Sequence, residues 1–296
     1  MILAAIDIGS NAARLLISET SIYKDGSVDF TKLTLLRIPL RLGFDVFNTG
    51  FVSEEKKQKL IETLKAYKLL MSIYNVEAYK ACATSAMRDA TNGPQIRREI
   101  FEETGFEIKI ISGLEEANIL YETHIAEGLA DNKSYIYIDV GGGSTEVTLF
   151  TEGHTIFKES FNIGTIRLLQ NKVTDEQWDH LKWFIKTHTK DHQPLEAIGT
   201  GGNINKIFSI SKRKEGKSLP LDLLKDYYKE LSYSTIEERK HLYHLRDDRA
   251  DVIVPALQVY VSIMRWAGAT EIYVPKIGLA DGLIKMLYNE RAGKLK

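Results

Sequence analysis

The sequence predicts an α/β fold organised as two duplicated domains. Apolar runs typical of β-strands alternate with helical patterns along the 296 residues, a length that suits about two domains. A strand–turn–strand segment occurs twice, at residues 5–17 and at residues 137–149. The two copies lie much farther apart than the units of a repeat array, so the duplication indicates two related domains.

The turn in each copy carries an acid followed by glycine. The aligned pairs are Asp7 with Asp139, Gly9 with Gly141, and Arg14 with Glu146. Glycines let backbone N–H groups approach an anion closely, and the hydroxyls of Ser144 and Thr145 add donors. Asp139 and Glu146, at the two ends of the second turn, can hold a divalent cation that a phosphate would share. A glycine-rich hairpin with incidental acids would explain one copy, but the second copy favours an anion site.

The composition is that of an ordinary globular chain, with 44% hydrophobic and 27% charged residues. Lys and Arg total 39 and Asp and Glu total 40, so no overall field would recruit nucleic acid and an anion must be met locally. The single cysteine excludes an intramolecular disulfide and suits a cytoplasmic location. The chain enters a strand without a basic leader and contains no run that could span a bilayer, so we expect neither a signal peptide nor a membrane partner.

The first half combines strand patterns with three helices. The second of its strands is followed by the turn residues Asp25 and Gly26, and the first helix begins at Ser53 with Glu54 and Glu55 in its first turn. The expected strands are residues 2–7, 12–19, 28–39, 76–83 and 106–111; a loop is expected at 40–49; helices are expected from Ser53, over 94–104, and from Ser112 to about Gly128.

Two charged residues stand just beyond strands of this half. Arg88 follows the small and hydroxyl residues after the fourth strand, where a guanidinium can grip a phosphate with two N–H groups; a surface ion pair with Asp89 explains it equally well. Ser112 and Glu115 form a capping-box pattern, so Glu115 has a structural role. Glu116 has no such role and can project into a cleft to act on a water, although its spacing alone favours a contribution to the helix dipole.

The second half repeats the order of the first, with one helical insertion. Gly199–Asn203 follows a strand where Ala83–Arg88 follows one in the first half, and the insertion covers roughly residues 205–267. Arg249 and Asp251 in the insertion could reach a cleft, although most charges in such a segment are solvated. We therefore expect domains at residues 1–124 and 125–296. The expected strands are residues 135–139, 146–150, 155–161, 196–198 and 271–274, with a helix from about 174 to 189.

These motifs resemble the exopolyphosphatase / guanosine pentaphosphate phosphatase family, in a short two-domain form. The matching segments, from residue 4 to residue 284, are AIDIGSNAARLLI, ATSAMRDATNG, ISGLEEA, YIDVGGGSTE, IGTIRL, GTGGN, RADVI and GLADGLI. The resemblance implies two ribonuclease H-like domains of the actin-like ATPase (ASKHA) type that flank an interdomain cleft. Ala280 and Asn203 depart from the family, since many relatives have arginine and threonine there.

The resemblance also implies roles for individual residues. Glu116 would be the base for the attacking water, and Arg88 would contact the scissile phosphate. Mg²⁺ or another divalent cation would be held by Asp139, Glu146 and Asp7. Phosphate would be bound by Ser10 and Asn11 of the first loop and by Gly141, Gly142, Gly143, Ser144 and Thr145 of the second.

The activity implied is hydrolysis of a terminal phosphoanhydride. The substrate would be polyphosphate or a guanosine tetra- or pentaphosphate, and the product would be inorganic phosphate. Relatives commonly form homodimers, so a homodimer is a further expectation from the resemblance. The chemistry is coherent without the family, because amide loops, an arginine and a metal neutralise a dense anion while a carboxylate activates water.

Two other classes of protein share parts of this pattern. Cys82 and Arg88 have the C-x5-R spacing of a cysteine phosphatase, but the intervening loop lacks glycine and Cys82 is expected to face the core. An ATP-binding kinase or nucleotide-binding switch of the actin-like fold would share the turns, and the GTGGN segment could serve adenosine. Glu116 favours hydrolysis over the kinase interpretation.

Overall fold

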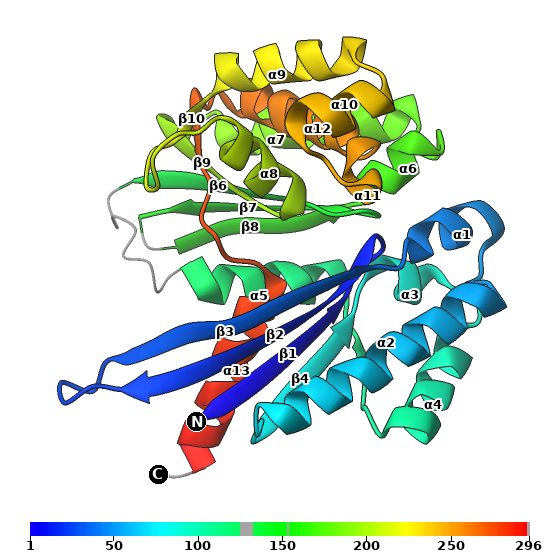
Figure 1. Ribbon diagram of the computed structural model, residues 1–296. Helices are drawn as coiled ribbons and strands as arrows, with labels where there is room; N and C mark the ends of the chain where they lie inside the picture. The colour runs from blue at the N-terminus through cyan, green and yellow to red at the C-terminus, as the bar shows by residue number, and fades with distance from the viewer. Residues whose placement is uncertain (125–132, 153, 295–296) are drawn as a thin grey trace. The chain divides into compact units, whose positions relative to one another are not determined.

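The structure, a computed structural model, describes residues 1–124, 133–152 and 154–294 (Figure 1). The chain divides into two compact units. Unit 1 comprises residues 1–123 together with the C-terminal segment from Gly278, and unit 2 comprises residues 124–277. Each unit consists of a mixed β-sheet with helices, and each is described by itself below.

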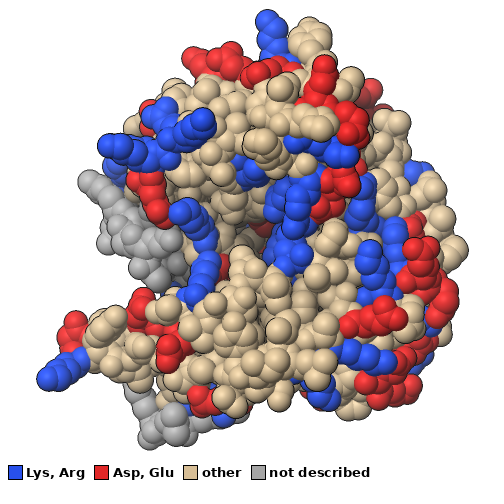
Figure 2. Space-filling model, in the orientation of Figure 1, with Lys and Arg blue, Asp and Glu red and all other residues tan. Residues whose placement is uncertain are grey.

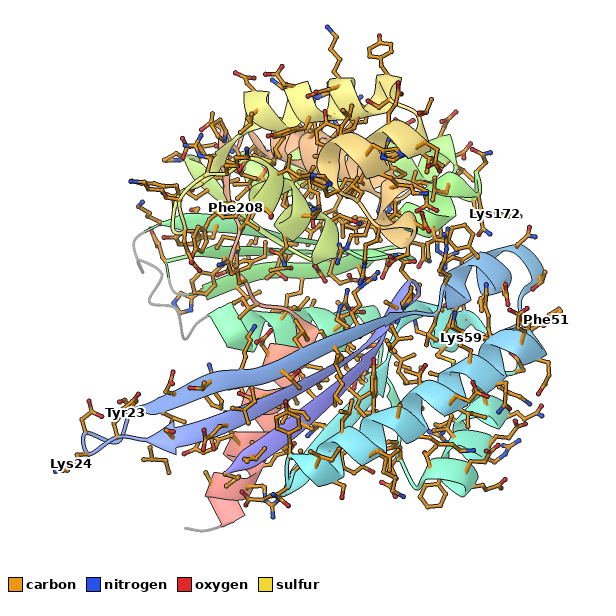
Figure 3. The ribbon with its side chains drawn as sticks, in the orientation of Figure 1. Tyr23, Lys24, Phe51, Lys59, Lys172 and Phe208 are labelled. Atoms are coloured by element: carbon orange, nitrogen blue, oxygen red, sulfur yellow. The ribbon has the colours of Figure 1, made fainter. Side chains whose placement is uncertain are left out.

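The sheet of unit 1 has the strand order β3-β2-β1-β4-β5. Antiparallel pairing joins β1, β2 and β3, and parallel pairing joins β1, β4 and β5. At the tip of the β2–β3 hairpin, Tyr23 and Lys24 point away from the sheet (Figure 3). The strands are β1 (Ile2–Ile8), β2 (Ala12–Ile22), β3 (Val28–Pro39), β4 (Ala78–Ala83) and β5 (Lys109–Ile110). The predicted strand 106–111 is thus confirmed only over two residues.

The helices of unit 1 bury apolar stripes against this sheet. The predicted helix from Ser53 is α2, whose buried residues Leu60, Leu64 and Tyr67 lie at helical spacing. The helices are α1 (Leu42–Thr49), α2 (Glu54–Ile73), α3 (Ser85–Asp89), α4 (Gly93–Thr104), α5 (Gly113–His124) and α13 (Leu279–Lys294). The expected continuation of α5 to Gly128 lies outside the described residues.

The prediction of a loop over residues 40–49 is wrong, because the structure has helix α1 there. Gly43, Asn48 and Gly50 are typical of turns, but Leu42, Val46 and Phe47 lie on one helical face and are buried. Gly50 ends the helix in the left-handed region at φ 84°, a conformation that glycine adopts without strain. Burial of this apolar face outweighs the local turn propensity.

The final helix, α13, packs in unit 1, whereas the predicted domain 125–296 places it with the second half. Leu279, Leu283 and Ile284 belong to the same buried cluster as Leu3 of β1 and Cys82 of β4. Helix α13 packs against strands β1, β2 and β4, which are far from it in the sequence, so local sequence does not indicate its partner.

The sheet of unit 2 has the order β10-β11-β9-β6-β7-β8. Its strands are β6 (Ser134–Val140), β7 (Thr145–Thr151), β8 (His154–Phe161), β9 (Leu195–Thr200), β10 (Leu219–Pro220) and β11 (Glu271–Tyr273). Its helices are α6 (Thr165–Leu169), α7 (Asp175–Thr189), α8 (Gly202–Ile210), α9 (Leu221–Tyr233), α10 (Ile236–Tyr243), α11 (Asp247–Ala250) and α12 (Ile253–Ala267). Helix α12 carries much of the buried core of the unit.

The duplication predicted from the sequence is confirmed in the sheet topology. The order β8-β7-β6-β9-β11 in unit 2 repeats the order β3-β2-β1-β4-β5 of unit 1, with β10 added at the edge. The register also repeats, because Asp7 is opposite Arg14 and Asp139 is opposite Glu146. The Gly9 amide donates to the Ala12 carbonyl at 3.0 Å, and the Gly141 amide donates to the Ser144 carbonyl at 2.9 Å. The chain therefore contains two copies of one α/β unit.

Candidate functional site

Two acids face each other across strands β6 and β7. Asp139 and Glu146 are directly opposite in the antiparallel ladder, and their carboxylate oxygens approach within 4.8 Å. The Thr200 hydroxyl donates to Asp139 Oδ1 at 2.9 Å, and the Ser160 hydroxyl donates to Glu146 Oε1 at 2.8 Å. Like charges directly opposite on a sheet repel each other, and Glu146 is only 3% exposed. A divalent cation relieves this repulsion, and carboxylate oxygens are the ligands it prefers.

The glycine turn between these acids is oriented by hydrogen bonds to the start of α6. The carbonyls of Gly141 and Gly142 accept from the amides of Thr165 and Ile166 at 3.0 and 2.8 Å, and the Gly143 carbonyl accepts from Arg167 Nε at 2.7 Å. In a trans peptide the next N–H points opposite to the carbonyl, so the amides of residues 142–144 point away from α6. These amides form a group of donors with one direction, which suits an anion.

Gly164 permits the close approach of α6 to this turn. A Cβ at this position would lie 2.4 Å from the Gly143 carbonyl carbon and 2.5 Å from that of Gly142. Within the described part of the chain, the amides of Gly142 and Gly143 donate to no backbone carbonyl. The hydroxyl of Thr145, in contrast, donates to the Ile163 carbonyl at 2.5 Å in the interior, so its proton already has an acceptor.

A buried tyrosine that our sequence analysis missed lies behind this turn. The Tyr260 hydroxyl donates to the Thr200 carbonyl and accepts from the Val140 amide at 3.3 Å. It thereby joins the ends of β6 and β9 where Asp139 and Thr200 meet. Burial, reinforced by the charge of Asp139, raises the pKa of Tyr260 well above its ordinary value. The signal in the sequence is one tyrosine within an apolar helix, since a buried tyrosine O–H needs a hydrogen-bond partner.

The GTGGN segment packs closely against the acid pair in unit 2. Gly201 has φ 105°, and a Cβ there would lie 2.9 Å from Asp139 Oδ1. A Cβ at Gly202 would lie 2.7 Å from the guanidinium of Arg249, which donates to the Gly202 carbonyl. Glycine is therefore required at position 201, where φ is positive, whereas at position 202 the close atoms belong to the flexible end of Arg249.

The first turn, in unit 1, has the same geometry but different electrostatics. Arg14 Nη1 donates to Asp7 Oδ2 at 2.5 Å, and Asp7 is 3% exposed. Arg14 occupies the position in unit 1 that is equivalent to Glu146 in unit 2. Unit 1 therefore has the counter-ion of Asp7 at this position, where unit 2 has a second acid. A cation at Asp7 would have to compete with Arg14, whereas a cation at Asp139 and Glu146 would neutralise two acids.

The first turn is connected to helix α3, which carries Arg88. The hydroxyls of Ser10 and Ser85 are hydrogen-bonded at 2.8 Å, and both residues are buried. The carbonyl of Asn11 accepts from the amide of Arg41 at 2.9 Å. Ser10 and Asn11, both predicted to bind phosphate, are thus held between α3 and the segment that leads into α1.

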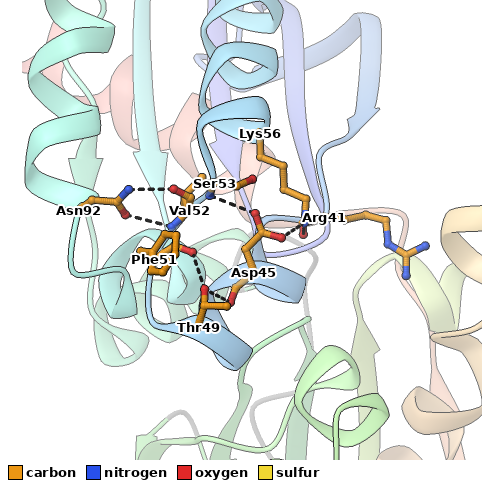
Figure 4. Close-up of polar contacts among 8 residues, drawn as sticks. All are labelled: Arg41, Asp45, Thr49, Phe51, Val52, Ser53, Lys56 and Asn92. Atoms are coloured by element: carbon orange, nitrogen blue, oxygen red, sulfur yellow. Dashed lines mark hydrogen bonds and ion pairs between the residues drawn. The ribbon is translucent and has the colours of Figure 1, made fainter.

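Helix α1 and the segment after it are held by a polar network (Figure 4). Lys56 Nζ donates to the Arg41 carbonyl at 2.9 Å and to Asp45 Oδ1 at 2.5 Å, and the Ser53 amide donates to Asp45 Oδ2 at 3.1 Å. Asn92, which precedes α4, exchanges two hydrogen bonds with the Val52 backbone, at 3.0 and 2.8 Å. The network links the first turn, α2 and the α3–α4 connection.

Arg88 contacts the strand end that precedes helix α5. Its Nη1 donates to the Ile111 carbonyl at 2.9 Å, while its Nε lies 3.8 Å from Asp89 Oδ1. The short contact with Ile111 is the better defined of the two, so Arg88 is oriented toward the start of α5. The Glu116 amide donates to the Ser112 carbonyl at 3.0 Å in the first turn of that helix. Unit 1 thus brings Arg88 and the first turn of α5 together.

The predicted capping box at α5 is confirmed. The Ser112 amide donates to Glu115 Oε2 at 2.8 Å, and the Glu115 amide donates to Ser112 Oγ at 3.1 Å. Hydrogen bonds from Lys109 and then from Ser112 lower the pKa of Glu115 to about 2. Glu115 therefore caps the helix, and the neighbouring Glu116 is half-buried.

The environment of Cys82 argues against a cysteine phosphatase. Cys82 is 1% exposed in β4 and lies in the cluster formed with α13. Burial, followed by the negative charge of Asp7, raises the pKa of the thiol well above its ordinary value. A nucleophilic cysteine needs the opposite shift, because the thiolate is the reactive form.

Across the face shown in Figure 2, acidic and basic side chains both occur, in keeping with a net charge of −1. Among the described residues, helices are too short or too polar to cross a bilayer. Because the net charge is close to zero, binding of an anionic ligand would depend on local groups such as those of the two turns.

Comparison with known proteins decides the family. Residues 21–290 match the sequence profile of the Ppx/GppA phosphatase family. The chain belongs to this family. A bifunctional 3-dehydroquinate synthase/phosphatase from Fusobacterium nucleatum is 33% identical over 230 residues, which cover 72% of the chain and 34% of that protein. Exopolyphosphatase 2 of Mycobacterium tuberculosis is 30% identical over 178 residues, 56% of the chain and 53% of that protein. The match thus spans about a third of the length of the Fusobacterium nucleatum protein and about half of the length of the Mycobacterium tuberculosis protein.

Solved structures of the Ppx/GppA family share the fold. The Aquifex aeolicus family member aligns with a TM-score of 0.75 at 26% identity, covering 98% of both chains. An exopolyphosphatase from Cytophaga hutchinsonii aligns with a TM-score of 0.85 at 22% identity, again over 98% of both chains, and shows the fold alone. The predicted fold, two duplicated actin-like α/β domains, is confirmed; the cleft between them stays a prediction.

Proposed function

We propose that this chain is a phosphoanhydride hydrolase that releases terminal inorganic phosphate from polyphosphate or from guanosine tetra- or pentaphosphate. The observation that carries the proposal is the pair of opposed acids, Asp139 and Glu146, at the two ends of a glycine turn whose amides point in one direction. Family membership and the exopolyphosphatase activity named for the M. tuberculosis relative support the same chemistry.

The residues of unit 2 fit a divalent cation, for which we propose Mg²⁺. Asp139 and Glu146 would hold it, and Asp7 would contribute from the first turn if it is released from Arg14. When bound, the cation would neutralise charge on the phosphate oxygens. The amides of residues 142–144 would bind the same phosphate group, since backbone donors with fixed direction stabilise a developing negative charge without reorganisation.

We further propose that Glu116 accepts a proton from the attacking water and that Arg88 binds the scissile phosphate. Glu116 lies in the first turn of α5, close to the strand end that Arg88 contacts, and the capping box of this helix is formed by Glu115 and not by Glu116. Arg88, held at the Ile111 carbonyl, is positioned by the same strand end. The mechanism requires that these groups of unit 1 reach the phosphate held by unit 2.

The test is phosphate release with Mg²⁺ by the wild type and by Glu116→Gln, with short polyphosphate, long polyphosphate and guanosine pentaphosphate as substrates. Removal of a general base is expected to lower kcat by about 100-fold or more. Glu55→Gln is the matched control, because Glu55 also lies in the first turn of a helix and is exposed. A folded Glu116→Gln variant with wild-type activity would refute the proposed base.

The kinase or nucleotide-switch interpretation makes a different prediction in the same assay. A kinase would consume ATP only when a small acceptor is present, and the wild type would be inert toward all three phosphate substrates. That result would overturn the hydrolase proposal. The cytoplasmic location and the homodimer stay predictions.

A further inference from the structure

Four residues form a row across the sheet of unit 2, which we call the acid–hydroxyl row. Asp139 of β6 and Glu146 of β7 are the inner pair of the row. On the outer sides, Thr200 of β9 is the register partner of the aspartate, and Ser160 of β8 is the register partner of the glutamate. Register partners on neighbouring strands point to the same face of a sheet, so both hydroxyls lie beside the acids.

Each hydroxyl of the row donates to the acid next to it. Thr200 Oγ1 donates to Asp139 Oδ1 at 2.9 Å, and Ser160 Oγ donates to Glu146 Oε1 at 2.8 Å. Hydrogen bonds to an ionised acceptor are roughly twice as strong as those between neutral groups. One named oxygen of each carboxylate is therefore held by a protein donor from the neighbouring strand.

The hydroxyl of Thr200 has a fixed position. Thr200 is 3% exposed, and its carbonyl accepts from the buried hydroxyl of Tyr260. The backbone of the next residue also passes close to the same carboxylate oxygen, since a Cβ at Gly201 would lie 2.9 Å from Asp139 Oδ1. The side of Asp139 that faces β9 is thus occupied by the protein.

The equivalent row in unit 1 carries no hydroxyl. Asp7 of β1 has Cys82 of β4 and Arg14 of β2 as its register partners. Arg37 of β3 completes that row, opposite the arginine of β2. The duplicated fold therefore does not require hydroxyls at the outer positions. In unit 2 they accompany the pair of acids, which points to a role in what the acids bind.

Divalent cations differ in how they use carboxylates. Ca²⁺ takes about six to eight oxygen ligands and often binds both oxygens of one carboxylate, whereas Mg²⁺ is octahedral, keeps several waters and is held by one or two carboxylates and by substrate phosphates. A cation that bound both oxygens of Asp139 or Glu146 would have to displace a hydroxyl donor. A cation bound through Asp139 Oδ2 and Glu146 Oε2 would leave both hydrogen bonds intact.

We propose that Thr200 and Ser160 are specificity-determining residues, whose hydroxyls make the acid pair select Mg²⁺ over Ca²⁺. By holding one oxygen of each acid, they restrict each carboxylate to a single ligand atom. This arrangement suits a small cation that completes its octahedron with waters and phosphate oxygens. The inference rests on the proposed cation site at Asp139 and Glu146, and it identifies the groups that set the choice of ion there.

The experiment measures cation binding by the full chain without substrate. Binding of Mn²⁺ is followed by the electron paramagnetic resonance signal of the free ion, and Mg²⁺ or Ca²⁺ is added as a competitor. Mn²⁺ ions whose binding is lost in Glu146→Gln are those at the acid pair. The selectivity ratio is the Ca²⁺ concentration that displaces half of these ions divided by the corresponding Mg²⁺ concentration, and it should exceed one in the wild type.

The double variant Thr200→Val/Ser160→Ala removes both hydroxyls with little change in volume. We expect its selectivity ratio to fall about tenfold or more, because groups that hydrogen-bond to metal ligands typically contribute this much to metal affinity. Thr200→Ser/Ser160→Thr keeps both hydroxyls and should retain the wild-type ratio. Ser160→Ala alone, at a half-buried residue, should lower the ratio in the same direction and provides the test if the double variant does not fold.

The matched control is Thr189→Val/Ser211→Ala. It makes the same changes in unit 2 at two hydroxyls that donate to backbone carbonyls, those of Ile185 and Phe208, and it should keep the wild-type ratio. An unchanged ratio in Thr200→Val/Ser160→Ala, or an equal fall in the control, would overturn the inference and leave the cation site in place. A wild type without Mn²⁺ binding that depends on Glu146 would overturn the proposed cation site as well.

Discussion

At residue 14 and residue 146, the two duplicated turns carry opposite charges at the same cross-strand position. Arg14 neutralises Asp7 in unit 1, while Glu146 adds its charge to that of Asp139 in unit 2. The backbone geometry is shared, so the difference in chemistry comes from one side chain. A sheet tolerates two opposed acids only when other groups offset the repulsion, here hydroxyl donors and, in our proposal, a cation.

The substitution Glu146→Gln should distinguish the effect of Glu146 on Mg²⁺ binding from its effect on the stability of the fold. The substitution removes one charge of the pair, so the Mg²⁺ concentration for half-maximal phosphate release should rise roughly tenfold or more. In EDTA, the free energy of unfolding should instead rise by about 0.2–1 kcal/mol, because the repulsion is relieved. Metal titration and urea unfolding measure the two effects.

The matched control is Glu271→Gln, an exposed acid at the start of β11. It should change neither the Mg²⁺ requirement nor the stability in EDTA. An unchanged Mg²⁺ requirement in Glu146→Gln would exclude Glu146 as a metal ligand, and a lower stability in EDTA would show that the two acids do not repel each other.

Among the elements, helix α1 and the segment that follows it connect the predicted phosphate groups of unit 1. Arg41, just before α1, donates to the Asn11 carbonyl, and Val52, after α1, donates to Asn92, which lies four residues after Arg88. Burial alone would raise the pKa of Asp45, but hydrogen bonds from Lys56 and Ser53 outweigh it and lower that pKa. This element therefore positions the first turn relative to α3 through hydrogen bonds and buried apolar groups.

Asn92→Ala is expected to weaken this connection. It removes both hydrogen bonds to the Val52 backbone, and Val52 is 2% exposed, so a buried N–H and a buried C=O lose their partner. The expected loss is about 1–3 kcal/mol of unfolding free energy. Urea unfolding followed by circular dichroism measures it, with Asn48→Ala, an exposed residue of α1, as the control. Equal stabilities of the two variants would show that the network is not stabilising.

Considered as a whole, the molecule has two units that each bury a tyrosine near a charged turn. Tyr67 in unit 1 donates to the Ala13 carbonyl at 3.1 Å, and Tyr260 in unit 2 donates to the Thr200 carbonyl. In both, burial is the main cause of a raised pKa, followed by the charge of Asp7 or of Asp139. These two phenols therefore hold their protons more tightly in the folded chain than in the unfolded chain.

Because the pKa values of Tyr67 and Tyr260 are higher in the folded chain than in the unfolded chain, we expect the free energy of unfolding to fall at alkaline pH. The stabilisation is fully present below the unfolded pKa of 10.0 and is lost as the pH rises from that value toward the folded pKa. Urea unfolding at pH 9 and pH 11 measures it. Tryptophan fluorescence reports unit 2, because Trp178, Trp183 and Trp266 all lie there.

In Tyr260→Phe, the fluorescence-detected stability should depend less on pH between these two values than in the wild type. Tyr233→Phe, with Tyr233 83% exposed, should behave like the wild type. The same pH dependence in Tyr260→Phe and the wild type would show that Tyr260 does not titrate as expected.

The sequence by itself determined the features that depend on neighbours in the chain. Most strands of both sheets, the turns with Asp7 and Asp139, and the capping box of Ser112 and Glu115 follow from residue type and short spacing, whereas β10 was not predicted and the strand expected at 106–111 covers only two residues. Duplication was visible because both copies keep an acid and a glycine at the same two positions. The α/β class and the family therefore follow from local pattern and motif.

Tertiary structure alone decided the contacts between distant segments. The ion pair of Asp7 with Arg14 depends on strand register, the hydrogen bond from Val140 to Tyr260 spans 120 residues, and α13 packs on the sheet formed at the start of the chain. Helix α1 forms because a short apolar face is buried, against local turn signals. The partners of Val140 and of α13 lie far away in the sequence, and the contact of Asp7 with Arg14 depends on which residues pair across β1 and β2, so residue type and short spacing do not indicate these contacts.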